Sequence, residues 1–116
     1  MSLNLQCSLE EVDGVQVLRL IGRLDTITSP LLDQQIQKVC QKAPCRLVLN
    51  FDQIEYLSSA GMRVVLSAAK KLQASGGRLA LAQVQEQVMD LIRMAGFDTI
   101  LTIAGTEGEA IQKVQG

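Results

Sequence analysis

Short apolar runs with the spacing of β-strands alternate with segments of helical periodicity along this sequence, and this order constrains the fold most. Apolar residues alternate with polar ones over residues 3–9, and a second strand-like run covers residues 15–21. Asp13 and Gly14 between the two runs supply turn chemistry. The first part of the chain is therefore predicted to form a β-hairpin.

Strand–helix units follow the hairpin. Ser29 before Pro30 has the order of a helix N-cap and a first helical residue. The further predicted segments, in chain order, are a helix to about residue 40, a strand over 45–51, a helix over 59–75, a strand over 78–82, a helix over 88–96, a strand over 99–103 and a short capped helix over 106–114. This order, β-β-α-β-α-β-α-β-α, predicts a single α/β domain over residues 1–116, with a mostly parallel sheet that carries helices.

Composition agrees with one domain that has an aliphatic core. The chain has 116 residues, of which 47% are hydrophobic and only 3% aromatic. A net charge of -1 gives no electrostatic basis for binding nucleic acid or an anionic membrane. With no signal-like or membrane-spanning run, the protein is expected to be cytoplasmic, without direct membrane insertion.

The residues that usually carry catalysis are missing. The sequence has no histidine, which removes the commonest general base and the usual activator of a serine or cysteine nucleophile. Glu10, Glu11, Glu107 and Glu109 fall where surface turns and a helix start are predicted, so they are expected to be solvated. No phosphate-binding glycine loop is present. We therefore expect no enzyme activity, no cofactor and no metal.

The three cysteines are odd in number and lack Cys-x-x-Cys spacing. This pattern suggests neither a disulfide framework nor a zinc site. The cysteines are expected to be small buried hydrophobic residues in a reducing compartment, at positions Cys7, Cys40 and Cys45.

The junction between the strand over 45–51 and the next helix carries two serines, Ser58 and Ser59. Ser58 has the character of an N-cap, and Gly61 that of a small residue which permits close packing of helix on sheet. Met62 and Leu66 extend the apolar arc of the helix beyond the stripe that packing on a sheet needs. They are predicted either to form an exposed protein contact or to meet another helix of the domain.

Several segments in order resemble the STAS domains, and most closely the stand-alone anti-sigma factor antagonists. The resemblance rests on Gly22-x-Leu24-Asp25, on residues 47–51 leading into 57–61, on Gly76-Gly77, and on residues 88–94 followed by Gly96-Phe97. It covers almost the whole chain. This sequence departs from the family at Ser58, where the family often has aspartate.

The resemblance implies partner switching. In that family the phosphorylated residue lies two positions before the glycine of the segment, which is Ser59 here, with Ser58 as a secondary candidate. The unmodified protein would bind an anti-sigma factor that is also a serine kinase, and a PP2C-type phosphatase would reset it. ATP would serve the kinase and not this chain. The predicted partner-binding residues are Asp25, Thr26, Ser58, Ser59, Gly61, Met62, Arg63 and Leu66.

Two predicted site residues have plainer alternatives, and so has the function. Asp25 is equally well explained as a turn or cap residue, and Arg63 as a solvated side chain. The alternative function is a stand-alone STAS subunit of an anion or lipid transport complex. A small-molecule sensor is a third hypothesis, although no aromatic or cofactor-like cluster supports it.

Overall fold

The predicted order of elements is confirmed by the computed structural model, which describes residues 5–115. The elements are β1 (Gln6–Val12), β2 (Val15–Leu24), α1 (Ser29–Val39), β3 (Arg46–Leu57), α2 (Ser59–Ala74), β4 (Arg78–Ala82), α3 (Glu86–Met94), the 3-10 turn η1 (Phe97–Thr99), β5 (Thr102–Ala104) and α4 (Glu107–Gln115). Leu3, which begins the alternating run of the predicted hairpin, lies outside the described residues.

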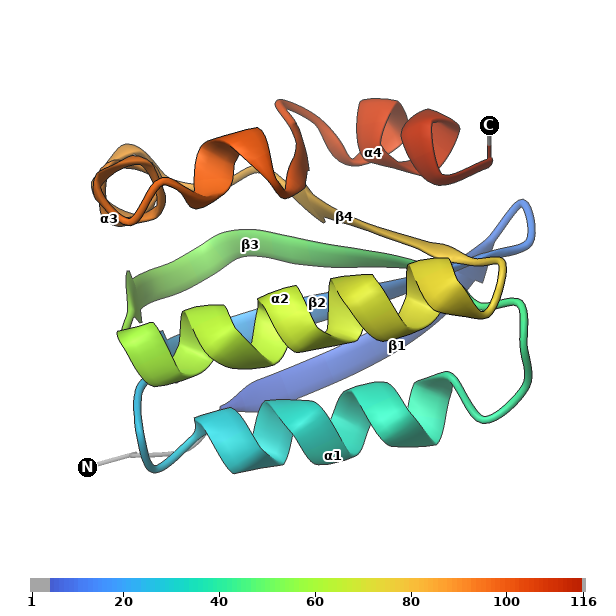
Figure 1. Ribbon diagram of the computed structural model, residues 1–116, viewed down its shortest axis with the longest axis horizontal. Coiled ribbons are helices and arrows are strands. Elements are labelled where there is room, and N and C mark those ends of the chain that lie inside the picture. The colour runs from blue at the N-terminus through green and yellow to red at the C-terminus, as the bar shows by residue number, and fades with distance from the viewer. Residues whose placement is uncertain (1–4, 116) are drawn as a thin grey trace.

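One five-stranded sheet organises the domain, with its strands in the order β1-β2-β3-β4-β5. β1 and β2 form the antiparallel hairpin, and every later pair of neighbouring strands is parallel. Helices α1 and α2 lie side by side on one face of the sheet, and both begin at the same end of it (Figure 1). Helix α4 packs on the opposite face, over β3, β4 and β5.

The sheet separates two aliphatic cores. The larger core lies between the sheet and helices α1, α2 and α3, and the smaller one lies under α4. β3 contributes to both, because successive side chains of a strand point to opposite faces. Leu47, Val48 and Leu49 are each fully buried, which confirms the prediction of a central strand that is covered on both sides.

β3 is longer than the sequence indicated. It does not end at Phe51 but continues to Leu57, so the connection expected after Phe51 is part of the strand. The reason is that pairing with β2 resumes after irregularities in register, with Gly22 opposite Ile54 and Leu24 opposite Leu57. Ile54 and Leu57 are buried, so the extension is held by the core as well as by the sheet.

The start of α1 also differs by one residue from the prediction. Thr28 occupies the N-cap position and Ser29 is the first helical residue. The Ser29 hydroxyl donates a hydrogen bond to the backbone carbonyl of Asp25, so it fastens the preceding loop and caps no amide. In the last helix the predicted cap is confirmed, because the Thr106 hydroxyl accepts the backbone N–H of Glu109 at 3.1 Å.

The third helix and the last strand are shifted from their predicted bounds. α3 begins at Glu86, two residues before the predicted Val88, because Gln85 takes the N-cap position. β5 begins at Thr102 and not at Thr99, because residues 97–99 form η1.

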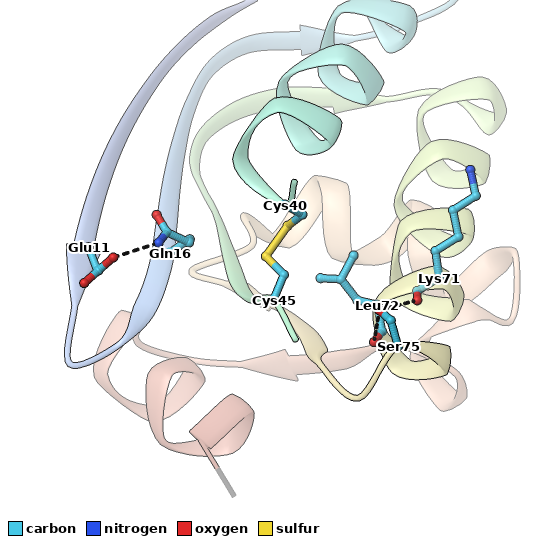
Figure 2. The surroundings of a disulfide bond; sticks show 7 residues. All are labelled: Glu11, Gln16, Cys40, Cys45, Lys71, Leu72 and Ser75. Carbon is cyan, nitrogen blue, oxygen red and sulfur yellow. Dashed lines mark hydrogen bonds between the residues drawn. A yellow bond between two sulfur atoms is a disulfide. The ribbon is translucent and has the colours of Figure 1, made fainter. Parts of the chain in front are cut away.

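The prediction that the cysteines form no disulfide is wrong. Cys40 and Cys45 are joined by a disulfide across a sequence separation of 5 residues (Figure 2). Cys7 is free and half-buried. The end of α1 turns back into β3, and this turn brings the two Cα atoms to 5.4 Å, within the range that a disulfide requires. The spacing of the cysteines in the sequence did not reveal that Cys40 and Cys45 lie this close together.

Candidate functional site

The two serines at the junction of β3 and α2 differ in what their hydroxyl groups do. Ser58 is the N-cap of α2, and its Oγ accepts a hydrogen bond from the backbone N–H of Gly61 at 3.1 Å. Ser59 is the first residue of the helix and is exposed. The capping role expected of Ser58 is thus confirmed, and Ser59 presents its hydroxyl at the surface.

The start of α2 is fastened to the end of β2. The backbone N–H of Ser58 donates to the carbonyl of Leu24 at 2.7 Å. Gly61 is buried there, and a Cβ at this position would lie 3.0 Å from the Leu24 Cβ and 3.1 Å from the Leu24 carbonyl oxygen. The close approach expected of Gly61 is therefore confirmed, and it holds Ser59 near the loop that follows β2.

That loop is shaped by Asp25. Its carboxylate oxygen Oδ1 accepts the backbone N–H groups of Ile27 and Thr28 at 2.9 and 3.0 Å. The bond from Thr28, aided by that from Ile27, lowers the pKa of Asp25 below its ordinary value. The Thr28 hydroxyl in turn donates to the carbonyl of Arg23 at 2.6 Å. Asp25 thus has the turn-forming role that was one of its two interpretations, and its contact with a partner stays a prediction.

A groove runs between α1 and α2 from this loop. Its volume is about 700 Å³. It adjoins Ser59, since Thr26 on one side and Ala60 on the other belong to its lining. The remaining lining residues are Ser29, Pro30 and Asp33 from α1, and Arg63, Val64, Ser67 and Lys71 from α2.

Met62 does not belong to an exposed contact. Its side chain is only 7% exposed and packs in the larger core, while Leu66 is half-buried against the same core. For Met62, the prediction of an exposed contact is wrong, because the side chain packs inside the domain. Of the predicted partner-binding residues, the structure exposes Thr26, Ser59 and Arg63, leaves Asp25, Ser58 and Leu66 half-buried, and buries Gly61 and Met62.

Other exposed residues near the loop were not singled out from the sequence. Ile27 and Leu31 are 62% and 40% exposed, which is unusual for large aliphatic side chains. Leu31 lies off the buried stripe of α1, which was a signal that could have revealed it, whereas Ile27 precedes the helix and had no such signal. The Arg23 guanidinium lies 4.7 Å above the centre of the Tyr56 ring, and only the β2–β3 register brings these two residues opposite each other.

The expectation that Glu107 is solvated is wrong, because its carboxylate is hydrogen-bonded within the domain. Arg19 donates to its two carboxylate oxygens at 3.0 and 2.7 Å, and the buried side chain of Asn50 donates at 2.7 Å. The hydrogen bond from Arg19 contributes most to lowering the pKa of Glu107. These bonds fix the start of α4 to β2 and β3, on the opposite face of the sheet from Ser59. Glu109 is exposed, as predicted.

Two further observations concern metal sites and membrane-spanning helices. Among residues 5–115, no three histidine, cysteine, aspartate or glutamate residues gather so that they could hold a metal ion. Within the same part of the chain, every helix is too short or too polar to span a lipid bilayer.

Comparison with known proteins identifies the family. The family model of the STAS domain matches residues 6–110 of the chain. The chain belongs to the STAS family. The STAS domain described here is 31% identical to the anti-sigma F factor antagonist of Paenibacillus polymyxa over 97% of each chain.

Solved structures of STAS proteins have the same fold. The anti-sigma factor antagonist SpoIIAA in its unphosphorylated form superposes with a TM-score of 0.77 at 29% identity, covering 96% of this chain and 97% of that one. The phosphorylated form of SpoIIAA from Bacillus gives a TM-score of 0.68 at 26% identity, over 94% of this chain and 99% of that one. Both states of a phosphorylated relative are thus similar to this STAS domain.

Proposed function

We propose that this chain is an anti-sigma factor antagonist that acts by partner switching. The unphosphorylated protein binds an anti-sigma factor with serine kinase activity, which then releases its sigma factor. Phosphorylation of Ser59 ends this binding. The observation that carries the proposal is the exposed Ser59 hydroxyl, at the start of α2 and beside the groove between α1 and α2. The names of the relatives support the same role.

The position of Ser59 suits a switch that changes a surface and spares the fold. A phosphate adds about -1.5 to -2 charges. At a helix N-terminus it meets free backbone N–H groups and the positive end of the helix dipole, a contribution of about 0.3–1 kcal/mol when exposed. Against a partner without matching cations the same charge is repelled or costly to desolvate, and about 1.4 kcal/mol gives a tenfold loss of affinity.

The binding surface that we propose surrounds Ser59. Thr26 and Arg63 line the adjoining groove, Asp25 holds the adjoining turn, and the exposed Ile27 and Leu31 add apolar area. A small apolar patch next to a chargeable hydroxyl is suited to a contact that must form and dissociate. The chain thus acts as one regulatory domain in the cytoplasm, without catalysis or a cofactor of its own, and a PP2C-type phosphatase restores the binding form.

Mass spectrometry after incubation with ATP and an extract of the source cells tests this proposal. Phosphate should appear on the wild type and on Ser58→Ala, and should be absent from Ser59→Ala. In pull-downs from the extract, Ser59→Ala should retain an anti-sigma factor and Ser59→Glu should lose it. Phosphate that remained on Ser59→Ala would contradict the assignment, and capture of transport proteins in place of an anti-sigma factor would favour the transport-subunit alternative.

A further inference from the structure

The disulfide between Cys40 and Cys45 lies at the opposite end of α1 from the proposed binding surface (Figures 1 and 2). Cys40 is the C-cap residue of α1, and Cys45 directly precedes β3. Within the helix, only Ser29, Leu32 and Ile36 are buried. The disulfide therefore links α1 covalently to the start of β3, and few buried side chains hold this helix otherwise. The other end of α1 forms one wall of the groove.

The Cys45 side of this disulfide is fixed in place. Cys45 is only 6% exposed, and its carbonyl accepts the backbone N–H of Arg78 at 3.1 Å. A Cβ at Gly77 would lie 1.9 Å from the same carbonyl oxygen, so the backbone of Gly77 packs directly against it. Leu72, from the last turn of α2, points toward the bond (Figure 2). If the disulfide is reduced, Cys40 and α1 are therefore the parts that gain conformational freedom, because Cys45 stays fixed.

A cationic hollow adjoins Cys45. It has a volume of about 310 Å³ and is lined by Lys38, Lys42 and Arg46, with no acidic side chain among the lining residues. The nearby Glu11 accepts a hydrogen bond from the Gln16 side-chain amide at 2.9 Å and is not part of that lining (Figure 2). Positive charge here attracts an anionic reactant to the two cysteines.

We infer that Cys40 and Cys45 form a reversible redox modification site for anionic low-molecular-mass disulfides, and that its oxidised form fastens α1 and so maintains the groove between α1 and α2. The exchange reaction is independent of the function proposed above. Only its effect on partner binding rests on that function.

The reaction is a two-step thiol–disulfide exchange. In the dithiol form, the thiolate of the more exposed Cys40 attacks one sulfur of the small disulfide, which leaves a mixed disulfide on Cys40 and releases one small thiolate. The Cys45 thiolate then attacks the Cys40 sulfur and releases the second small thiolate. Two protein thiols are oxidised, one small disulfide is reduced to two thiols, and the protons lost by the cysteines are taken up by the two leaving thiolates.

Glutathione disulfide is a suitable anionic probe for the reaction. Reduced protein, freed of reductant, should form the Cys40–Cys45 bond, and Cys7 should react slowly because burial raises the pKa of its thiol. The double variant Lys38→Gln/Lys42→Gln should react several-fold more slowly with glutathione disulfide and at an unchanged rate with neutral hydroxyethyl disulfide. Equal slowing with both reagents, or none with either, would overturn the cationic part of the inference.

Hydrogen exchange followed by mass spectrometry tests the effect on α1. Amides of residues 29–39 should exchange several-fold faster in the reduced protein and in Cys40→Ser/Cys45→Ser than in the oxidised protein, while Cys7→Ser should match the wild type. Unchanged protection of α1 across redox states would refute the inference and leave the proposed function standing. Affinity for the anti-sigma factor should fall with that protection, and absence of binding in both redox states would refute the proposed function alone.

Discussion

Replacing Gly61 by alanine tests how closely α2 must approach the end of β2. The added Cβ would lie 2.8 Å from the Leu57 Cδ1, 3.0 Å from the Leu24 Cβ and 3.1 Å from the Leu24 carbonyl oxygen. Leu57 is 2% exposed and has little room to turn away. Leu24 is fully buried and pairs with Leu57 of β3, so the strand has little freedom and the helix must move.

The expected loss of stability follows from two opposed effects. Overpacking of a core costs about 1–3 kcal/mol, and alanine offsets at most about 1 kcal/mol of this through its helix propensity. The free energy of unfolding should therefore fall by about 1–2 kcal/mol, a change of roughly 5- to 30-fold in the folding equilibrium. Displacement of α2 should also move Ser59 away from the loop at Asp25 and weaken partner binding.

Urea unfolding followed by circular dichroism measures this change. Gly108→Ala is a matched control, because Gly108 lies in α4 and an added Cβ would meet nothing within 4 Å beyond its chain neighbours and the backbone of its own helix. The control should be neutral or stabilised by up to about 1 kcal/mol. If Gly61→Ala unfolded at the same urea concentration as the wild type, or at a higher one, the argument from close approach would be refuted.

Three further predictions concern Ser58 and Ser59, Glu107, and Asp25. Ser58→Ala should lower the free energy of unfolding by about 1 kcal/mol through loss of the cap, whereas Ser59→Ala should change it by less than about 0.5 kcal/mol; similar urea midpoints for the two would contradict the different roles. Because its bond with Arg19 lowers the pKa of Glu107, the ionised carboxylate stabilises the fold above the ordinary pKa of 4.5, and this contribution disappears as pH falls through the lowered value. Glu107→Gln should thus be less stable than the wild type at neutral pH and approach it in acid, and a gap in unfolding free energy that persisted in acid would count against the pair. Asp25→Asn keeps the Oδ1 acceptor and should preserve the slow amide exchange of residues 27 and 28, which Asp25→Ala should lose when measured by NMR.

Periodicity and turn chemistry were enough to predict the order of the elements, because most segments are locally consistent with the fold. β4 was predicted over its full length, since a short apolar run is bounded by Gly76-Gly77 before it and a loop after it. The length of β3 was missed because its second half carries polar residues. That half is extended through pairing with β2 and burial of Ile54 and Leu57, which are tertiary effects.

The candidate site was predicted in its position but not in its details. Ser58 and Ser59 could be placed at a helix start from local signals alone. The burial of Met62 could not, because it depends on how far the larger core extends around α2. The Cys40–Cys45 disulfide likewise depends on where the chain turns after α1, and the pairing of Glu107 with Arg19 joins residues 88 positions apart.

The adjacency of Ser58 and Ser59 has a consequence for genetics. The Ser58 hydroxyl caps the helix and Ser59 is exposed. Under the function proposed above, loss of the Ser59 hydroxyl should leave a protein that accumulates at normal levels but no longer responds to a kinase. Alleles of Ser59 should therefore escape any screen based on abundance or solubility and emerge only when transcription is the readout. Alleles of Ser58 should show the reverse pattern, with reduced abundance and a response that survives in the protein that remains.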